Sequence, residues 1–136
     1  MHSSILHFNT SFLPIYFGGG AVAMQVAGTV FKKETINAIS HRLYLLTCLV
    51  TTITCGFGGA SIRASEASPE VNSLLLKTHA WTAMTVFLLT LFMAYFSLKI
   101  LRGKGEPAKT SKLLLITAIV FLLFFTATTL IAFKIR

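Results

Sequence analysis

Four histidines are the side chains best suited to chemistry in this sequence, and they are His2, His7, His41 and His79. His79 differs from the others because it is the only side chain that titrates near neutral pH in the charge-free run from residue 78 to residue 98. An ionisable group inside a membrane span is costly, so its presence there indicates a functional role and a specific partner. Imidazole can bind a metal, or it can form a hydrogen bond to a neighbouring helix.

The composition predicts a membrane protein with a single domain over residues 1–136. Hydrophobic residues make up 54% of the chain, charged residues only 12%, and the mean hydropathy is +0.76. A soluble domain carries about 25% charged residues. We therefore expect an all-α fold of four membrane-spanning helices, at about residues 5–31, 43–60, 74–100 and 113–133.

The distribution of basic residues predicts how these spans are oriented. The loops after the first and third spans, taken with Lys99, hold eight of the 12 basic residues. Positively charged loops stay on the cytoplasmic side, so both termini should lie on the outer side of the membrane. Short loops then favour an antiparallel up-down bundle. This rule accounts for the net charge of +8 without a nucleic-acid partner.

Small residues and Pro14 predict the shape of the first span. Pro14 lacks a backbone donor, so we expect a kink there. The small residues Gly18, Gly19, Gly20 and Ala21, followed by Ala23, Ala27 and Gly28, form a thin face that favours close packing of a neighbouring helix, although a cofactor could use the same space. In the second span, the two cysteines at positions 48 and 55 are too far apart along one helix for a disulfide, and we interpret them as packing residues.

Three of the four histidines converge on the outer leaflet in this topology. His2 and His7 lie at the start of the first span, and His79 lies about one turn inside the third. Two imidazoles from facing helices are a common way to hold a haem iron in a helical bundle. We therefore predict that His7 and His79 are the axial ligands of a haem b, with His2 as a substitute ligand.

A porphyrin between helices also needs space and a cation near its propionates. Gly56 and Gly59 supply small residues at the matching depth of the second span, and Arg63 lies just beyond them. We predict that these three residues contribute to the haem site.

Each of these residues also has a purely structural interpretation. His79 could form a hydrogen bond between helices, and His7 could be an ordinary polar residue of the interface. Arg63 could extend its charged end towards the membrane surface. His41, next to Arg42 and without a partner on its side of the membrane, is expected to lie among the lipid headgroups.

Three short motifs relate the chain to a known family. Residues 2–8 read His-Ser-Ser-Ile-Leu-His-Phe, residues 55–60 read Cys-Gly-Phe-Gly-Gly-Ala, and Trp81 follows His79 by two positions. In this order the chain resembles the DUF2231 family of four-span bacterial membrane proteins. The Pro that commonly follows each leading His in that family is replaced here by Ser3 and Asn9. The resemblance implies a haem-binding or respiratory-chain role, because relatives occur alongside cytochrome and Rieske-type modules.

The residues favour an electron carrier over an autonomous enzyme. All four glutamates fall in the predicted loops, so none can accept a proton from a quinone inside the bilayer. We expect a haem b subunit for electron transfer, within or beside a respiratory or photosynthetic complex, whose partners are lipids, other subunits and a periplasmic cytochrome c or a quinone. One alternative is a cofactor-free accessory subunit of a larger membrane complex. A further alternative is a histidine-based metal site or a transporter.

Overall fold

The computed structural model describes residues 10–65 and 73–135, apart from the side chains of residues 60–65, 73, 133 and 135. The described chain forms four helices and no strand: α2 (Leu13–Val30), α3 (Glu34–Ser65), α4 (Ser73–Leu101) and α5 (Pro107–Ile135). Each of them is long and apolar enough to cross a membrane. The prediction of an all-α protein with four membrane-spanning helices agrees with these findings, while the single domain over residues 1–136 stays a prediction.

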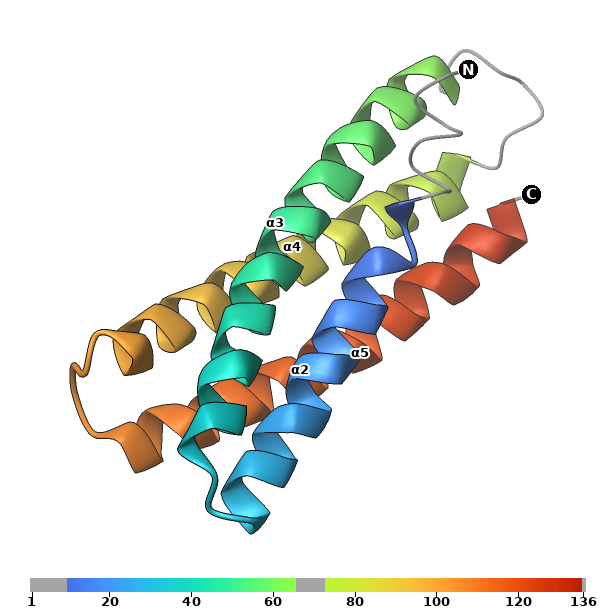
Figure 1. The fold of residues 1–136 in the computed structure, drawn as a ribbon. Helices are drawn as coiled ribbons and strands as arrows, with labels where there is room; N and C mark the ends of the chain where they lie inside the picture. The colour runs from blue at the N-terminus through green and yellow to red at the C-terminus, as the bar shows by residue number, and fades with distance from the viewer. Residues whose placement is uncertain (1–9, 66–72, 136) are drawn as a thin grey trace.

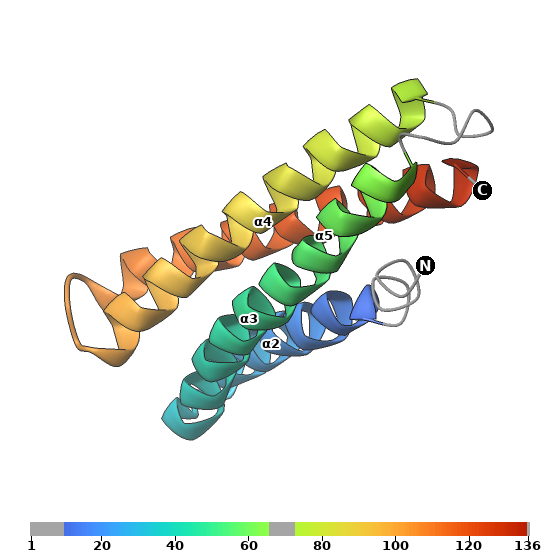
Figure 2. The ribbon, with the colours of Figure 1, turned by 90° about the horizontal axis from the view of Figure 1, so that it is seen from above.

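The helices pack as two close pairs. α2 packs mainly against α3, α4 packs mainly against α5, and α3 and α4 join the pairs. The turns at residues 31–33 and 102–106 lie at the same end of the molecule, which we call the turn end (Figure 1). The start of α2 and the end of α5 lie at the opposite end, which we call the terminal end. A second view shows the same grouping and the angle between the two pairs (Figure 2).

Both turns at the turn end close in the same way. After α2, Lys32 has a positive φ of 54°, and the N–H of Lys33 donates to the carbonyl of Gly28 at 2.9 Å. After α4, Gly103 has a φ of 68°, and the N–H of Lys104 donates to the carbonyl of Lys99 at 2.9 Å. A left-handed residue followed by this backbone bond satisfies carbonyls that the helix leaves without partners.

Two helices begin earlier than the hydropathy pattern predicted. α3 begins at Glu34, nine residues before the predicted span, and it continues past the expected end at residue 60 to Ser65. α5 begins at Pro107, six residues before the predicted span. Proline suits the first position of a helix because no N–H is needed there. α4 matches the prediction to within one residue at each end.

Pro14 lies at the start of α2. It lies in the first turn of α2, where its missing N–H costs no helical hydrogen bond. The predicted span from residue 5 begins outside the described residues, so its first part is not tested. The kink expected at Pro14 stays a prediction, because the chain before residue 10 lies outside the described residues.

Part of the small-residue face of α2 is used for close packing, as predicted, whereas a Cβ on Gly19 or Gly20 would meet nothing within 4 Å. A Cβ added to Gly18 would meet the ring of Phe121 at 2.7 Å, and one added to Gly28 would meet the backbone nitrogen of Asn37 at 2.9 Å. Both distances are shorter than real Cβ contacts allow. Gly18 therefore lets α5 approach α2, and Gly28 does the same for the start of α3.

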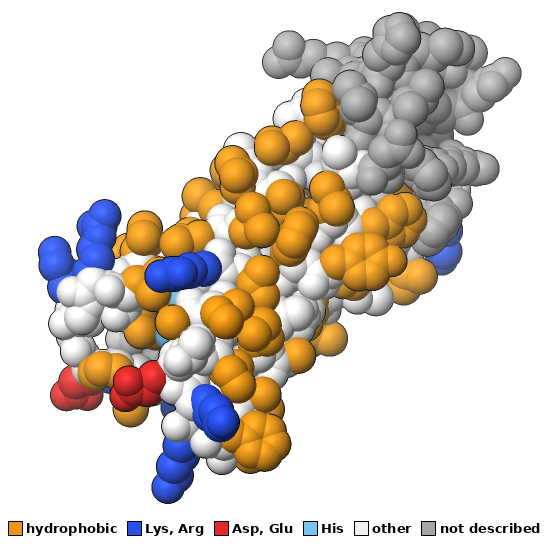
Figure 3. Space-filling view, in the orientation of Figure 1, with side chains coloured by type: hydrophobic (Ala, Val, Ile, Leu, Met, Phe, Trp, Pro, Cys, Tyr) orange, Lys and Arg blue, Asp and Glu red, His pale blue; other side chains and the backbone are white. Residues whose placement is uncertain are grey.

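The interior of the bundle is more polar than its surface. Among the described residues, ten buried side chains are polar or charged and eight are hydrophobic, whereas most large exposed side chains along the helices are apolar. Figure 3 shows hydrophobic side chains over the middle of one face and most of its Lys and Arg near the turn end. A surface of this kind suits lipid, which supports a multi-pass membrane protein.

Candidate functional site

His79 lies on α4 near the terminal end and reaches across to α5. Its Nδ1 lies 3.1 Å from the backbone carbonyl oxygen of Thr128. A carbonyl only accepts hydrogen bonds, so Nδ1 must carry the proton. In the neutral imidazole the lone pair is then on Nε2. A ring fixed in this way, with one N–H on a backbone carbonyl, is the usual arrangement of a metal-binding histidine.

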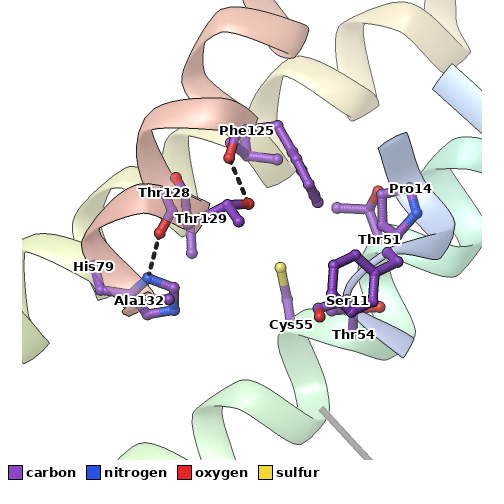
Figure 4. A pocket seen from close by; sticks show the side chains of 13 residues that line it. Ser11, Pro14, Thr51, Thr54, Cys55, His79, Phe125, Thr128, Thr129 and Ala132 are labelled. Carbon is purple, nitrogen blue, oxygen red and sulfur yellow. Dashed lines mark hydrogen bonds between the residues drawn. The ribbon is translucent and has the colours of Figure 1, made fainter. Parts of the chain in front are cut away.

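A cavity of about 100 Å³ lies beside His79, between all four helices. We call it the four-helix cavity. Figure 4 shows the side chains around it, with the sulfur of Cys55 directed towards its centre and His79 at one side. Its wall carries several hydroxyls among apolar groups and is formed by Ser11, Phe12, Pro14, Thr51, Thr54, Cys55, His79, Ala83, Val86, Phe125, Thr128, Thr129 and Ala132.

A larger hollow of about 420 Å³ lies between α3 and α4, and we call it the α3–α4 groove. Its lining is mostly small, and consists of Thr52, Cys55, Gly56, Gly58, Gly59, His79, Ala80, Ala83, Met84 and Phe87. A Cβ added to Gly56 or Gly59 would meet nothing within 4 Å. These two glycines therefore face space that another molecule can fill, in contrast to Gly18 and Gly28 on α2.

The cavity and the groove share one wall. Cys55, Ala83 and His79 line both of them. Among the described residues, His79 is the one side chain lining either hollow that titrates near neutral pH. Its imidazole belongs to the wall that the two hollows share. Any molecule bound in the groove and any molecule bound in the cavity would both lie near this ring.

The predicted site residues can be located only in part. His79, Gly56 and Gly59 line the α3–α4 groove together. Arg63 belongs to α3, but its side chain is outside the description. His2 and His7 lie outside the described residues, so the pairing of His7 with His79 stays a prediction.

His41 differs from its prediction. The side chain was expected among the lipid headgroups, but it is only 5% exposed and packs inside the turn end. The physical reason is the early start of α3, since residues 34–42 are helical and turn Ser40 and His41 towards the interior. His41 Nε2 has no hydrogen-bond partner among the described residues.

The groove fits a porphyrin better than the cavity does. Pockets for ligands of drug size measure ~300–1,000 Å³. The groove lies in this range, and the four-helix cavity is well below it. His79 would hold the iron of such a group through a ring nitrogen, and the flat ring would occupy the open space beside Gly56 and Gly59. Within the described part of the chain, no three His, Cys, Asp or Glu side chains cluster closely enough to hold a metal ion on their own.

A buried polar network at the turn end was missed by the sequence analysis. Gln25 Nε2 donates to the carbonyl of Ser111 at 2.9 Å and lies 3.0 Å from its hydroxyl, and the Tyr44 hydroxyl donates to Gln25 Oε1 at 2.6 Å. Three helices meet at this one amide, which is 1% exposed. The available signal was Gln25 itself, because a primary amide inside an apolar span needs polar partners.

Comparison with known proteins finds no relative of this chain. No protein-family model matches the chain, and neither the curated proteins nor the solved structures include a match. The resemblance to the DUF2231 family stays a prediction. What the fold defines is a class, a protein whose described residues form four helices long and apolar enough to cross a membrane.

Proposed function

We propose that this protein is a haem b-binding subunit for electron transfer, within or beside a respiratory or photosynthetic complex of the bacterial inner membrane. The four helices cross the membrane in alternating directions, with both termini on the periplasmic side. His79 and His7 would hold the haem iron. The partners are lipids, neighbouring subunits and a periplasmic cytochrome c or a quinone.

The observation that supports this proposal is the hydrogen bond from His79 Nδ1 to the Thr128 carbonyl, in a ring that lines the α3–α4 groove. The bond holds the ring in one orientation and leaves the lone pair on Nε2. A Cβ on Gly56 or Gly59 would meet nothing within 4 Å, which leaves room beside them for another molecule. Arg63, at the end of α3, supplies positive charge for the propionates. A haem bound there would supply a one-electron couple whose potential depends on its ligands and surroundings.

The test is a reduced-minus-oxidised absorption spectrum of the full-length protein purified in detergent from haem-replete cells. We expect a b-type α-band that is lost in His79→Ala and in His7→Ala. His41→Gln is the matched control, because it changes a buried histidine at the other end of the bundle and should retain the band. Loss in His79→Ala together with retention in His7→Ala would move the second ligand to His2. A featureless spectrum of the unmodified protein would contradict the proposal.

The same hydrogen bond also favours a second function, a cofactor-free accessory subunit. A histidine that ties α4 to α5 contributes to packing whether or not it binds iron. In that case His79→Ala lowers the resistance of the bundle to unfolding, and a bound chromophore never purifies with the protein. Measuring spectrum and stability on the same His79→Ala sample separates the two functions.

A further inference from the structure

We infer that the four-helix cavity is a hydrated chamber, which holds water hydrogen bonded to the hydroxyls of Thr51 and Thr128. This inference concerns a different space from the α3–α4 groove and does not depend on whether haem is bound. It rests on two buried hydroxyls and on the size of the cavity.

The first observation is that both hydroxyls are buried without a partner. Thr51 is 2% exposed and Thr128 is 9% exposed, and neither Oγ1 has a hydrogen-bond partner among the described residues. Both residues line the cavity, one from α3 and the other from α5. A buried hydroxyl without a partner is costly, and inside a lipid-embedded bundle bulk water cannot relieve that cost.

Other threonines of the same helices do have a hydrogen-bond partner, so the unpartnered state of Thr51 and Thr128 depends on the rotamer of each side chain. Thr47 donates to the carbonyl of Leu43 at 2.8 Å, and Thr129 donates to that of Phe125 at 2.9 Å. A helical threonine commonly makes this bond to the residue four positions earlier. Thr51 and Thr128 do not make it, and rotation about χ1 can direct their hydroxyls to a molecule in the cavity.

The volume of the four-helix cavity limits the size of the molecules that it can hold. An engineered apolar cavity of ~150 Å³ takes up benzene and otherwise stays dry. The four-helix cavity, at about 100 Å³, is smaller than that, so it excludes a substituted ring. Its two unpartnered hydroxyls also make it polar. At ~30 Å³ for each water in the liquid, the space suits about three water molecules.

The chamber lies against the imidazole that forms the shared wall. Thr128 contributes to both features, since its carbonyl accepts the His79 hydrogen bond and its side chain lines the chamber. Water in the chamber raises the polarity around His79. A group that binds in the groove through His79 would therefore have a polar neighbour deep within the bundle.

The test uses the two native cysteines of α3 as reporters of water. Cys55 lines the cavity, and Cys48, two turns earlier on the same helix, does not. X-ray hydroxyl-radical footprinting generates radicals from water in place, and thiols oxidise readily. In the full-length protein in lipid nanodiscs, we expect Cys55 to oxidise several-fold faster than Cys48. Equal rates would overturn the inference without the need for any variant.

A pair of valine substitutions separates the cavity from the groove. Thr51→Val together with Thr128→Val keeps the side-chain shape, removes both hydroxyls and leaves the groove lining unchanged. We expect this double variant to lose most of the excess oxidation of Cys55, whereas the control Thr47→Val retains it. Undiminished oxidation in the double variant would show that water reaches Cys55 through the groove, and would overturn the inference.

Stability gives a second readout whose sign differs between a wet and a dry cavity. In a dry cavity, removing an unpartnered hydroxyl relieves its desolvation cost, so Thr51→Val should raise the unfolding midpoint. In a hydrated chamber the hydroxyl has a partner, and the same change should lower the midpoint. We expect a lower midpoint for Thr51→Val and for Thr128→Val, and a rise in both would overturn the inference.

Discussion

The two ends of the bundle treat buried polar groups and glycines differently. At the turn end, Gln25 shares three short contacts with Tyr44 and Ser111, and Gly28 lies against Asn37. Towards the terminal end, Thr51 and Thr128 have unpartnered hydroxyls, and Gly56 faces open space. Unpartnered atoms also occur near the turn end, on Asn37, His41 and Ser97, but these residues line neither the cavity nor the groove.

This difference indicates that the two ends of the helices have different roles, with stabilising contacts at the turn end and open space at the terminal end. Between helices in lipid the hydrophobic effect supplies no driving force, so close packing and hydrogen bonds hold the bundle together. The turn end holds the network in which Gln25 links α2, α3 and α5. The terminal end gives up some of them and gains two hollows beside His79, which is the pattern expected where a binding site is kept at the expense of stability. Four sets of substitutions test this comparison.

The largest effect should come from Gln25→Leu. The substitution leaves the Tyr44 hydroxyl and the Ser111 carbonyl without their partner, so we expect a loss of ~2–4 kcal/mol in the free energy of unfolding. Unfolding in mixed micelles with increasing SDS, followed by helicity, measures it. Val26→Leu, on the lipid-facing side of the same helix, is the control. If both variants unfold at the same SDS fraction, the network does not stabilise the turn end.

Replacing one glycine at each end of the bundle by alanine compares the two ends directly. Gly28→Ala forces a Cβ against the backbone of Asn37, and overpacking of this kind costs ~1–3 kcal/mol. Gly59→Ala meets only open space, and the better helix propensity of alanine should leave the bundle unchanged or more stable by up to ~1 kcal/mol. The same SDS titration measures both. A loss at Gly59 as large as that at Gly28 would refute the contrast.

Tyr44→Phe should have a smaller effect than Gln25→Leu. It removes one hydrogen bond and leaves Gln25 Oε1 without its donor, at a cost of ~1 kcal/mol. Tyr95→Phe, at a lipid-facing position, is the control. Because Tyr44 contacts Gln25, the double variant with Gln25→Leu should lose less than the sum of the single losses. Additive losses would mean that the two side chains stabilise the bundle independently.

The smallest effects should come from the two turns. Lys32 adopts a left-handed conformation that costs a residue with a Cβ ~1–2 kcal/mol, so Lys32→Gly should stabilise the protein, by less than ~1 kcal/mol after the added chain entropy. Gly103→Ala places a Cβ in the same conformation and should destabilise by about 1 kcal/mol. Thermal unfolding in detergent checks both signs. Equal signs would show that the two turns do not share one closing motif.

The helical class and part of the site could be predicted from the sequence because both depend on local information. Long apolar runs predict spans whatever their neighbours are, and α4 was predicted to within a residue. Gly56, Gly59 and His79 were placed together by depth alone, and all three line one groove.

The remaining features depend on tertiary contacts that hydropathy does not report. The stretch before Leu43 looked like a loop because it is polar, yet Ser40 and His41 are polar side chains that face the interior. The partner of Gln25 lies 86 residues away on α5, and no local pattern indicates that pairing. The four-helix cavity is likewise defined only when all four helices are packed.

The position of Gln25 also constrains the order of assembly during synthesis. Its first partner, Tyr44, follows it by 19 residues, and its second, Ser111, is made only with the last helix. In the α2–α3 pair alone, the Oε1 of Gln25 has its donor, but its Nε2 has no partner until α5 has been made. A chain that ended before residue 111 would leave the donor side of this amide without its partner on α5.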